Sequence, residues 1–275
     1  MNITKPILRW AGGKSWLLQD IHKYLPNDFN NYHEPFIGGG SVFIYLKSTG
    51  IIQNKAYLSD LNESLINSYK IIKSFPEELI SHLKKYENTS DAYYRLRDVV
   101  TENNIEKAAI FIYLNRTSFN GIYRVNLKGK YNVPFGNRNL MQLFDYENIL
   151  KCSDTYVNAF FSANDFLKSL SKAQEYDLVF LDPPYTIAHE NNGFIKYNQK
   201  IFAWEDQIRL KKAIEELNDK NVHFILTNAA HSSIDKLYDG IGNKKILKRY
   251  SLIGGKGAKR SLYNEYLYYK NQNGL

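Results

Sequence analysis

Cysteine is nearly absent from this sequence. Cys152 is the only one in 275 residues, which excludes an internal disulfide and a zinc site built from several cysteines. The six histidines lack the spacing of metal ligands, so we expect no structural metal. Long apolar runs are also missing: the longest, 108–114, is too short to cross a bilayer, and the start of the chain lacks a signal-peptide core. We therefore expect a cytoplasmic protein without a membrane partner.

Acidic residues are absent from two long stretches, although the chain as a whole carries 36 basic and 28 acidic residues, a formal net charge of +8. No Asp or Glu occurs between Lys107 and Asp145, where basic and aromatic residues interleave, or from Gly240 to Asn264, which is rich in lysine. Such patches are typical of contacts with the phosphate backbone of a nucleic acid. Two solvated loops would show the same composition.

Short apolar or β-branched runs alternate with segments of helical period. The expected strands are 32–36, 56–59, 156–161, 178–181 and 222–227, and the expected helices are 14–24, 41–47, 165–170 and 205–217. This alternation predicts a parallel α/β sheet. Two further runs, 246–251 and 263–269, are separated only by a loop rich in Gly and Lys and predict a terminal hairpin at the sheet edge.

The alternation stops between about 61 and 150. Four helical patterns follow one another there, and a hairpin-like stretch, 121–134, turns at Lys128-Gly129. We therefore predict a main domain of residues 1–60 and 151–275 with an inserted domain of residues 61–150.

The sharpest motif is Asp182-Pro183-Pro184-Tyr185, directly after the expected strand 178–181. Open α/β sheets bind ligands at the carboxyl ends of their strands. The Asp182 carboxylate and the Pro183 carbonyl could each accept one hydrogen of an aromatic amine, which would localise the nitrogen lone pair for methyl transfer. Tyr185 could stack on a base flipped out of a duplex. The alternative is a proline-rich turn with a capping aspartate.

A second motif, EPFIGGGS at 34–41, runs from a short strand through three glycines into a helix. Glycines let the backbone approach a ligand closely. A dinucleotide fingerprint starting at Gly38 would need glycine where Phe43 stands, which argues against NAD. Asp60 ends the next strand, where an acidic side chain commonly accepts hydrogen bonds from a ribose. A tight turn would use the same glycines.

A third motif, WAGGKS at 10–15, resembles the end of a phosphate-binding loop, but Leu8 occupies the position of its first glycine. Lys14, at the expected helix start, could pair with a carboxylate such as that of the methionine part of a cofactor. An exposed lysine in the first turn is the alternative.

These three motifs, in this order and at these distances, resemble the bacterial and phage DNA adenine methyltransferases, including the group that methylates the adenine of GATC. The order, with cofactor motifs first, then an insert and the catalytic motif last, is similar to the alpha subgroup. The resemblance spans nearly the whole chain. It implies a Rossmann-like S-adenosylmethionine-dependent methyltransferase sheet of about seven strands with a terminal antiparallel hairpin, plus an inserted, mainly helical recognition domain with a β-hairpin.

The resemblance also implies S-adenosyl-L-methionine as the cofactor. Asp165 and Phe166 match positions near the adenine of this cofactor, and Asp182 would serve both ligands. The implied cofactor-binding residues are Trp10, Ala11, Gly12, Lys14, Glu34, Pro35, Phe36, Gly38, Gly39, Gly40, Asp60, Asp165, Phe166 and Asp182, and the implied catalytic residues are Asp182, Pro183, Pro184 and Tyr185.

The segments 116–126 and 131–136 are similar to the recognition hairpin of this family. Arg124 could donate bidentately to guanine, with a phosphate contact as the alternative. Phe119 could wedge into the base stack beside Asn120, while Ile122 and Pro134 could contact thymine methyl groups. Together with the basic patches, the expected DNA-binding residues are Arg116, Phe119, Asn120, Ile122, Arg124, Asn126, Lys128, Pro134, Arg138, Lys256, Lys259 and Arg260.

The expected partner is double-stranded DNA, bound by a protein that is monomeric in solution and of which more than one copy can occupy DNA. Two other readings of the motifs stay open. One is N-methylation of RNA or of a protein amide, which needs the same amine-activating chemistry. The other is a DNA-binding protein without catalysis, for which the basic hairpin would suffice.

Overall fold

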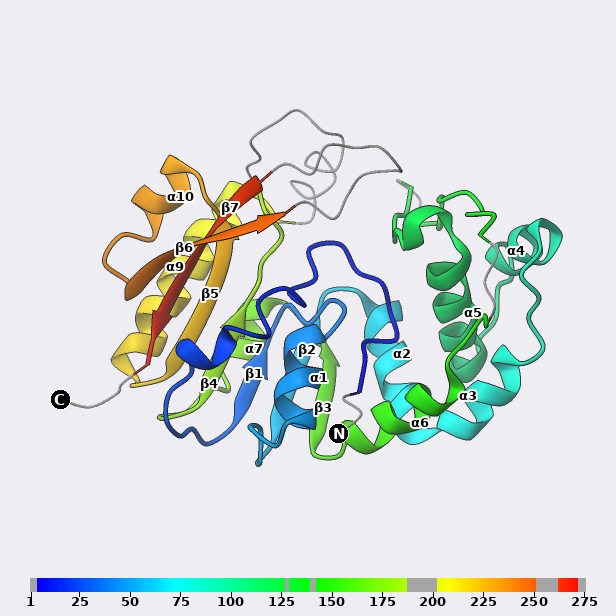
Figure 1. Ribbon diagram of the computed structural model, residues 1–275, viewed down its shortest axis with the longest axis horizontal. Helices are drawn as coiled ribbons and strands as arrows, with labels where there is room; N and C mark the ends of the chain where they lie inside the picture. The colour runs from blue at the N-terminus through cyan, green and yellow to red at the C-terminus, as the bar shows by residue number, and fades with distance from the viewer. Residues whose placement is uncertain (1–3, 127–128, 139–141, 187–201, 251–261, 272–275) are drawn as a thin grey trace. The chain divides into compact units, whose positions relative to one another are not determined.

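A seven-stranded sheet forms the framework of the chain, in the order β3-β2-β1-β4-β5-β7-β6 (Figure 1). The structure is a computed structural model and describes residues 4–126, 129–138, 142–186, 202–250 and 262–271. Strand β4 (Leu178–Leu181) is parallel to β1 (Tyr32–Glu34) and β5 (His223–Ala229). Strand β7 (Leu262–Lys270) is antiparallel to β5 and β6 (Asn243–Tyr250). The predicted α/β sheet with a terminal antiparallel hairpin is confirmed.

The chain divides into two compact units. The first comprises Met1–Ser15, Ile37–Gln53 and Leu58–Asn164, and the second comprises Trp16–Phe36, Asn54–Tyr57 and Asp165–Leu275. These units follow packing and not function, so the division into a catalytic and a recognition domain stays a prediction.

The first unit is mainly helical. Its central helix, α5 (Asn104–Thr117), is apolar on all sides along its middle, which is buried where the helix packs against α2 (Glu63–Ser74), α3 (Pro76–Leu83) and α4 (Ser90–Arg97). Side chains of the residues preceding α2, α4, α5 and α6 accept backbone hydrogen bonds and thereby define where these helices begin. The elements are α1 (Ser41–Ser48), β2 (Ala56–Asp60), α2 (Glu63–Ser74), α3 (Pro76–Leu83), α4 (Ser90–Arg97), α5 (Asn104–Thr117), the 3-10 turn η2 (Phe119–Gly121), α6 (Tyr146–Thr155) and β3 (Ala159–Ala163).

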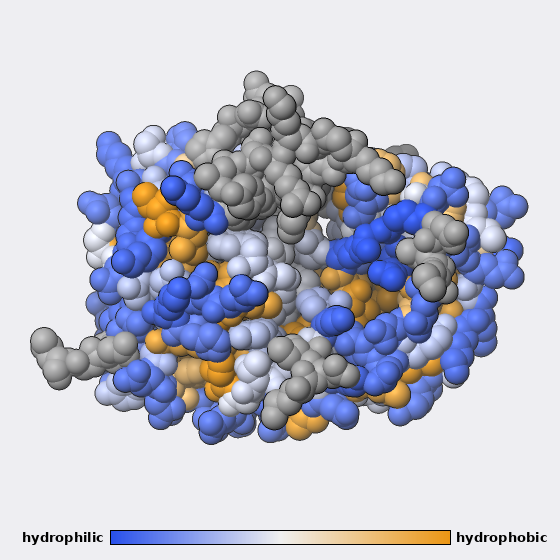
Figure 2. Space-filling model, viewed as in Figure 1, coloured by the Kyte–Doolittle hydropathy of each residue, from blue (hydrophilic) through white to orange (hydrophobic). Residues whose placement is uncertain are grey.

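The second unit packs helices onto strands β4, β5 and β7. Helix α9 (Trp204–Asp219) runs along β5 and contributes Leu210 and Ile214 to a buried core with Leu226 and Ile234 (Figure 1). The other helical elements are η1 (Ile21–Lys23), α7 (Phe166–Leu170) and α10 (Ser232–Leu237). None of the described helices in either unit is long and apolar enough to cross a membrane, and hydrophilic residues cover much of the face drawn in Figure 2.

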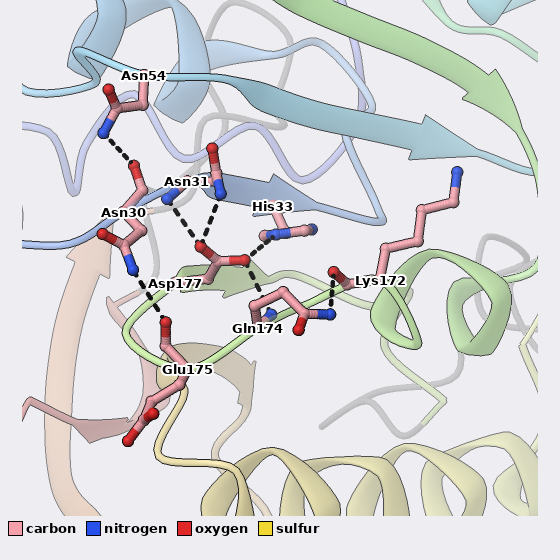
Figure 3. A network of polar contacts seen from close by, with 8 residues as sticks. All are labelled: Asn30, Asn31, His33, Asn54, Lys172, Gln174, Glu175 and Asp177. Atoms are coloured by element: carbon pink, nitrogen blue, oxygen red, sulfur yellow. Dashed lines mark hydrogen bonds and ion pairs between the residues drawn. The ribbon is translucent and has the colours of Figure 1, made fainter.

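A buried carboxylate fastens the amino ends of β1 and β4 in the second unit (Figure 3). Asp177 accepts hydrogen bonds from the backbone and side-chain amides of Asn31, from Nε2 of His33 at 2.8 Å and from the backbone of Gln174. Burial alone would raise the pKa of Asp177, but these donors outweigh it and lower that pKa. The network holds the parallel register of β1 and β4.

One predicted helix is wrong. Residues 14–24 form successive turns and the single 3-10 turn η1 in place of an α-helix. Leu17, Ile21 and Tyr24 are buried at helical spacing, but no side chain caps the turn, because the Asp20 carboxylate bonds Lys23 instead. Without a cap, a short helix has little to offset its nucleation cost.

The strand predicted at 156–161 begins later, at Ala159. Tyr156 instead ends helix α6, donating its N–H to the Cys152 carbonyl, and its buried ring packs against Phe43 and Tyr69. Asn158 has φ of 62°, which turns the chain between helix and strand.

Candidate active site

The Asp-Pro-Pro-Tyr motif leaves the carboxyl end of β4, as predicted. Thr227, the residue after the partner of Leu181 on β5, is fully buried (0% exposed) and donates its hydroxyl to Oδ1 of Asp182 at 2.8 Å. Because one carboxylate oxygen is engaged from the sheet side, the orientation of the Asp182 carboxylate is restricted. The same hydroxyl lies 3.4 Å from the Leu181 carbonyl, a longer contact.

Tyr185, at the other end of the motif, is held by the terminal hairpin. Its hydroxyl donates to Oε2 of Glu265 at 2.7 Å. Glu265 pairs with Ala229 across the β5–β7 ladder, which places it at the carboxyl end of β5 near Thr227. Two neighbouring strands thus hold the first and last residues of the motif.

A third buried contact follows directly after the motif. The Thr186 hydroxyl accepts from Nε2 of Gln207 on α9 at 3.4 Å. Oε1 of Gln207 in turn accepts from Asn228 at 3.0 Å and from the Tyr238 hydroxyl at 2.7 Å. Every polar group in this chain of contacts has a partner, as buried polar groups require.

Sequence reasoning missed Thr227, Glu265 and Gln207. The available signal was a pair of polar residues, Thr227 and Asn228, closing an otherwise apolar strand. Their partners could not be found from the sequence, because they come from elements that pair only in the fold.

Two expected cofactor residues of the second unit lie together. The rings of Phe36 and Phe166 are 5.4 Å apart, and the guanidinium of Arg209 lies 4.9 Å from the Phe166 ring. Arg209 also donates to Oδ1 of Asp165 at 3.0 Å, while the same oxygen accepts from the backbone of Leu167 and caps α7. Arg209, which the sequence did not single out, therefore fixes both Asp165 and the ring beside it.

Glu34, the last residue of β1, is buried in the same unit and accepts a hydrogen bond from the Tyr32 hydroxyl at 2.8 Å. The pKa of Tyr32 is raised well above its ordinary value, mainly because the hydroxyl is buried and also because Glu34 beside it is negatively charged. Tyr32 is therefore a permanent donor to Glu34. Pro35 and Phe36 continue the chain to the end of this unit's segment.

In the first unit the glycine loop lies against Trp10. A Cβ at Gly38 would come within 2.7 Å of Cδ1 of Trp10, and one at Gly39 within 3.1 Å of its Cβ. Gly38 and Gly40 have φ of 46° and 68°, a region that favours glycine. The Tyr69 hydroxyl donates to the Gly38 carbonyl at 2.8 Å. The glycines are therefore required by close packing as well as by backbone conformation.

Asp60 ends β2 beside this loop. Its Oδ2 accepts from the Gly38 backbone at 3.2 Å and its Oδ1 from the Asn62 backbone at 3.0 Å. Burial raises the pKa of Asp60, and the backbone donors only partly offset this effect. The structure thus brings Trp10, Gly38 and Asp60 together within one unit, and their role in binding a cofactor stays a prediction.

Lys14 is buried (3% exposed) and does not begin a helix, contrary to the expectation. Its Nζ donates to the Gly12 carbonyl at 2.7 Å, and its backbone N–H lies 3.3 Å from Oγ of Ser41 at the start of α1. Ala11 and Gly12 are exposed. The alternative of an exposed lysine is therefore wrong, and pairing of Lys14 with a cofactor carboxylate stays a prediction.

The recognition segment after α5 forms two isolated antiparallel bridges, Ser118 with Phe135 and Val125 with Tyr131. The hairpin turns near Gly129, whose N–H donates to the Asn126 carbonyl at 3.0 Å, while the Asn126 backbone donates to the Lys130 carbonyl at 2.8 Å. This is the predicted hairpin with less regular pairing.

Phe119 and Asn120 stand at the exposed end of this segment. The Phe119 side chain is 52% exposed, and Asn120 has φ of 55°. An exposed phenylalanine on a tight turn is suited to insertion between bases. Ile122 is partly buried and Pro134 is exposed.

Arg124 is exposed, and its guanidinium is hydrogen-bonded to Asn132 on the opposite side of the hairpin. Its Nε donates to Oδ1 of Asn132 at 2.9 Å and its Nη2 lies 3.4 Å from the Asn132 carbonyl. These contacts fix the plane of the guanidinium, which a bidentate contact with a base requires.

Arg116 and Arg138 hold the base of the same segment. Nε of Arg116 donates to the Leu143 carbonyl at 2.9 Å, and Nη2 of Arg138 donates to the carbonyls of Arg116 and Ser118 at 2.6 and 3.2 Å. Burial lowers the pKa of both arginines, and the positive charge of Arg9 adds to the effect. These three cations concentrate positive charge at the hairpin. Lys128, Lys256, Lys259 and Arg260 lie outside the described residues.

Comparison with known proteins identifies the family. The D12 class N6 adenine-specific DNA methyltransferase family matches residues 10–252. The type II methyltransferase M1.LlaDCHI of Lactococcus lactis subsp. cremoris is 34% identical over 95% of this chain and 93% of its own length. The type II methyltransferase M.MjaIII of Methanocaldococcus jannaschii is 34% identical over 94% and 95%. A DNA adenine methylase of Escherichia coli is 32% identical over 83% and 82%.

The chain therefore belongs to the D12 class of N6 adenine-specific DNA methyltransferases. This result confirms the resemblance and the assignment as an enzyme. It does not favour either alternative, methylation of RNA or a protein amide, or DNA binding without catalysis.

Proposed function

We propose that this chain transfers a methyl group from S-adenosylmethionine to the exocyclic amino group of adenine within GATC in duplex DNA, after flipping the adenine out of the helix. The observation that carries the proposal is the anchored Asp-Pro-Pro-Tyr motif, in which Thr227 holds Asp182 and Glu265 holds Tyr185.

The chemistry of the motif suits an aromatic amine. The lone pair of adenine N6 is delocalised into the ring and reacts poorly with an electrophile. The Asp182 carboxylate and the Pro183 carbonyl can accept the two amino hydrogens, so that the lone pair points at the methyl donor. Both prolines lack an N–H, which leaves acceptors on this surface of the loop.

The cofactor supplies an electrophilic methyl group on a sulfonium centre. The residues of this chain fit such a ligand: a glycine loop with no room for a Cβ, a strand-end Asp60 that can accept ribose hydroxyls, and the Phe36 and Phe166 rings beside Asp165. We propose that Trp10, the glycine loop and Asp60 in the first unit, and Phe36, Asp165 and Phe166 in the second, are cofactor-binding residues.

The hairpin is the proposed reader of the target sequence. Arg124, oriented by Asn132, is assigned to guanine, and Phe119 to the space left by the flipped adenine. Arg116 and Arg138 add positive charge that favours phosphate nearby. We expect a monomer in solution.

Tritiated methyl transfer to duplexes with and without GATC tests the proposal. The wild type should label only GATC duplexes, at adenine N6. Asp182→Ala should abolish transfer, because an acceptor for the amine disappears. Label in duplexes that lack GATC would overturn the sequence assignment, and substantial turnover by Asp182→Ala would overturn the role of the carboxylate.

A further inference from the structure

A carboxylate of the terminal hairpin reaches the catalytic loop. Glu265 is 2% exposed and lies on β7, a strand otherwise rich in aromatic and aliphatic side chains, of which Leu267 and Tyr268 are buried. Burying a carboxylate costs free energy that only strong donors can offset. The donor shown for Glu265 is the Tyr185 hydroxyl at 2.7 Å.

The contact restrains the direction in which the Tyr185 side chain extends from the loop. The χ1 torsion of a tyrosine has three staggered wells, and anchoring the hydroxyl selects the one in which the ring points at Glu265. Pro183 and Pro184 fix the backbone at one end of Tyr185, and Glu265 fixes the hydroxyl at the other. The ring is therefore held at both ends.

We propose that Glu265 is a positioning residue for the methyl-transfer reaction, whose carboxylate holds the Tyr185 side chain in the position at which the flipped adenine stacks on its ring. The inference rests on the proposed function, because it assumes that the target base stacks on Tyr185. Glu265 touches no reacting atom and acts through the tyrosine.

A structural role and a positioning role predict different results. If Glu265 served stability alone, its removal would lower the melting temperature. Such a variant would then methylate at the wild-type rate at temperatures well below its melting temperature, where the protein is folded. A positioning role predicts that Glu265→Leu loses rate at these temperatures as well, whereas Glu265→Gln, which retains an acceptor oxygen, keeps most of the rate.

The experiment measures single-turnover methylation of a GATC duplex, the dissociation constant of S-adenosylmethionine and thermal unfolding for each variant. Glu265→Leu should slow methyl transfer about tenfold, the lower end of the range for losing one hydrogen bond to a charged group, because the bond acts on the reaction only through the tyrosine. Tyr185→Phe should be slowed similarly, and the double variant should be no slower than either single variant, because both remove the same contact. Cofactor affinity should stay at the wild-type value. Tyr268→Phe, which removes a hydroxyl from the same strand, is the matched control and should match the wild type.

The outcomes separate the two proposals. Suppose that the wild type methylates GATC and that Glu265→Leu or Tyr185→Phe is equally fast. This result overturns the positioning role and leaves the proposed function standing. Additive losses in the double variant, or a rate loss that tracks a lower melting temperature, also overturn it. A wild type that transfers no methyl group to any duplex overturns the proposed function first. If Glu265→Leu does not fold, Tyr185→Phe and Glu265→Gln decide the matter.

Discussion

Replacing Thr227 with valine tests how strongly the sheet controls the catalytic carboxylate. Valine has nearly the shape of threonine, so the buried strand β5 keeps its packing while the donor to Oδ1 of Asp182 is lost. A hydrogen bond to a charged group contributes about 1.5 to 3 kcal/mol. If the whole contribution acts in the transition state, methyl transfer slows about 10- to 150-fold.

The assay is the single-turnover rate on a GATC duplex, with the affinities for cofactor and DNA measured separately. Thr227→Ser keeps the hydroxyl and should recover most of the rate. Thr155→Val removes a hydroxyl that donates to the Lys151 carbonyl on α6, far along the chain from the motif, and serves as the control. If Thr227→Val is as fast as the wild type, the carboxylate does not depend on this donor and the reasoning fails.

Three further changes probe the other parts of the proposed site. Arg124→Ala should cost about 1 to 3 kcal/mol of discrimination at one guanine, measured by competition between GATC and substituted duplexes, whereas equal weakening on every sequence would identify a phosphate contact. Asp60→Ala should weaken cofactor binding, measured by calorimetry, with little change in DNA affinity. Burial raises the pKa of Asp60, so the cofactor affinity of the wild type should fall as the pH drops through that pKa, because the protonated carboxyl is a poorer acceptor. Gly38→Ala should lower the melting temperature by a few degrees, about 2 to 4 °C per kcal/mol in a chain of this size, because its Cβ would meet Trp10; an unchanged melting temperature would show that the ring moves away freely.

The strand ends were predictable from the sequence because each joins an apolar run to a charged residue. Asp60 and Asp182 follow such runs directly, and the structure places each at the end of its strand. The segment 14–24 was mispredicted because burial of Leu17 and Ile21 alone produces a helical spacing, which successive turns satisfy equally well.

The anchors of the motif were beyond prediction for a different reason. Thr227 and Glu265 each lie next to another polar residue, Asn228 and Asn264, near one end of a strand, a pattern that usually indicates nothing more than a strand end. Their significance depends on which loop faces them, and Glu265 meets a tyrosine 80 positions away. Only the antiparallel pairing of β7 with β5 brings that carboxylate to the loop.

The position of β7 in chain order has a consequence for the newborn protein. During synthesis the loop at 182–185 leaves the ribosome before Glu265 does. The hydrogen bond from Tyr185 to Glu265 can therefore form only after β7 has been synthesised and has paired with β5. Nascent chains and fragments that stop before β7 lack this anchor and should methylate DNA more slowly than the whole chain, and a separate peptide with the sequence of β7 should raise the rate of such a fragment.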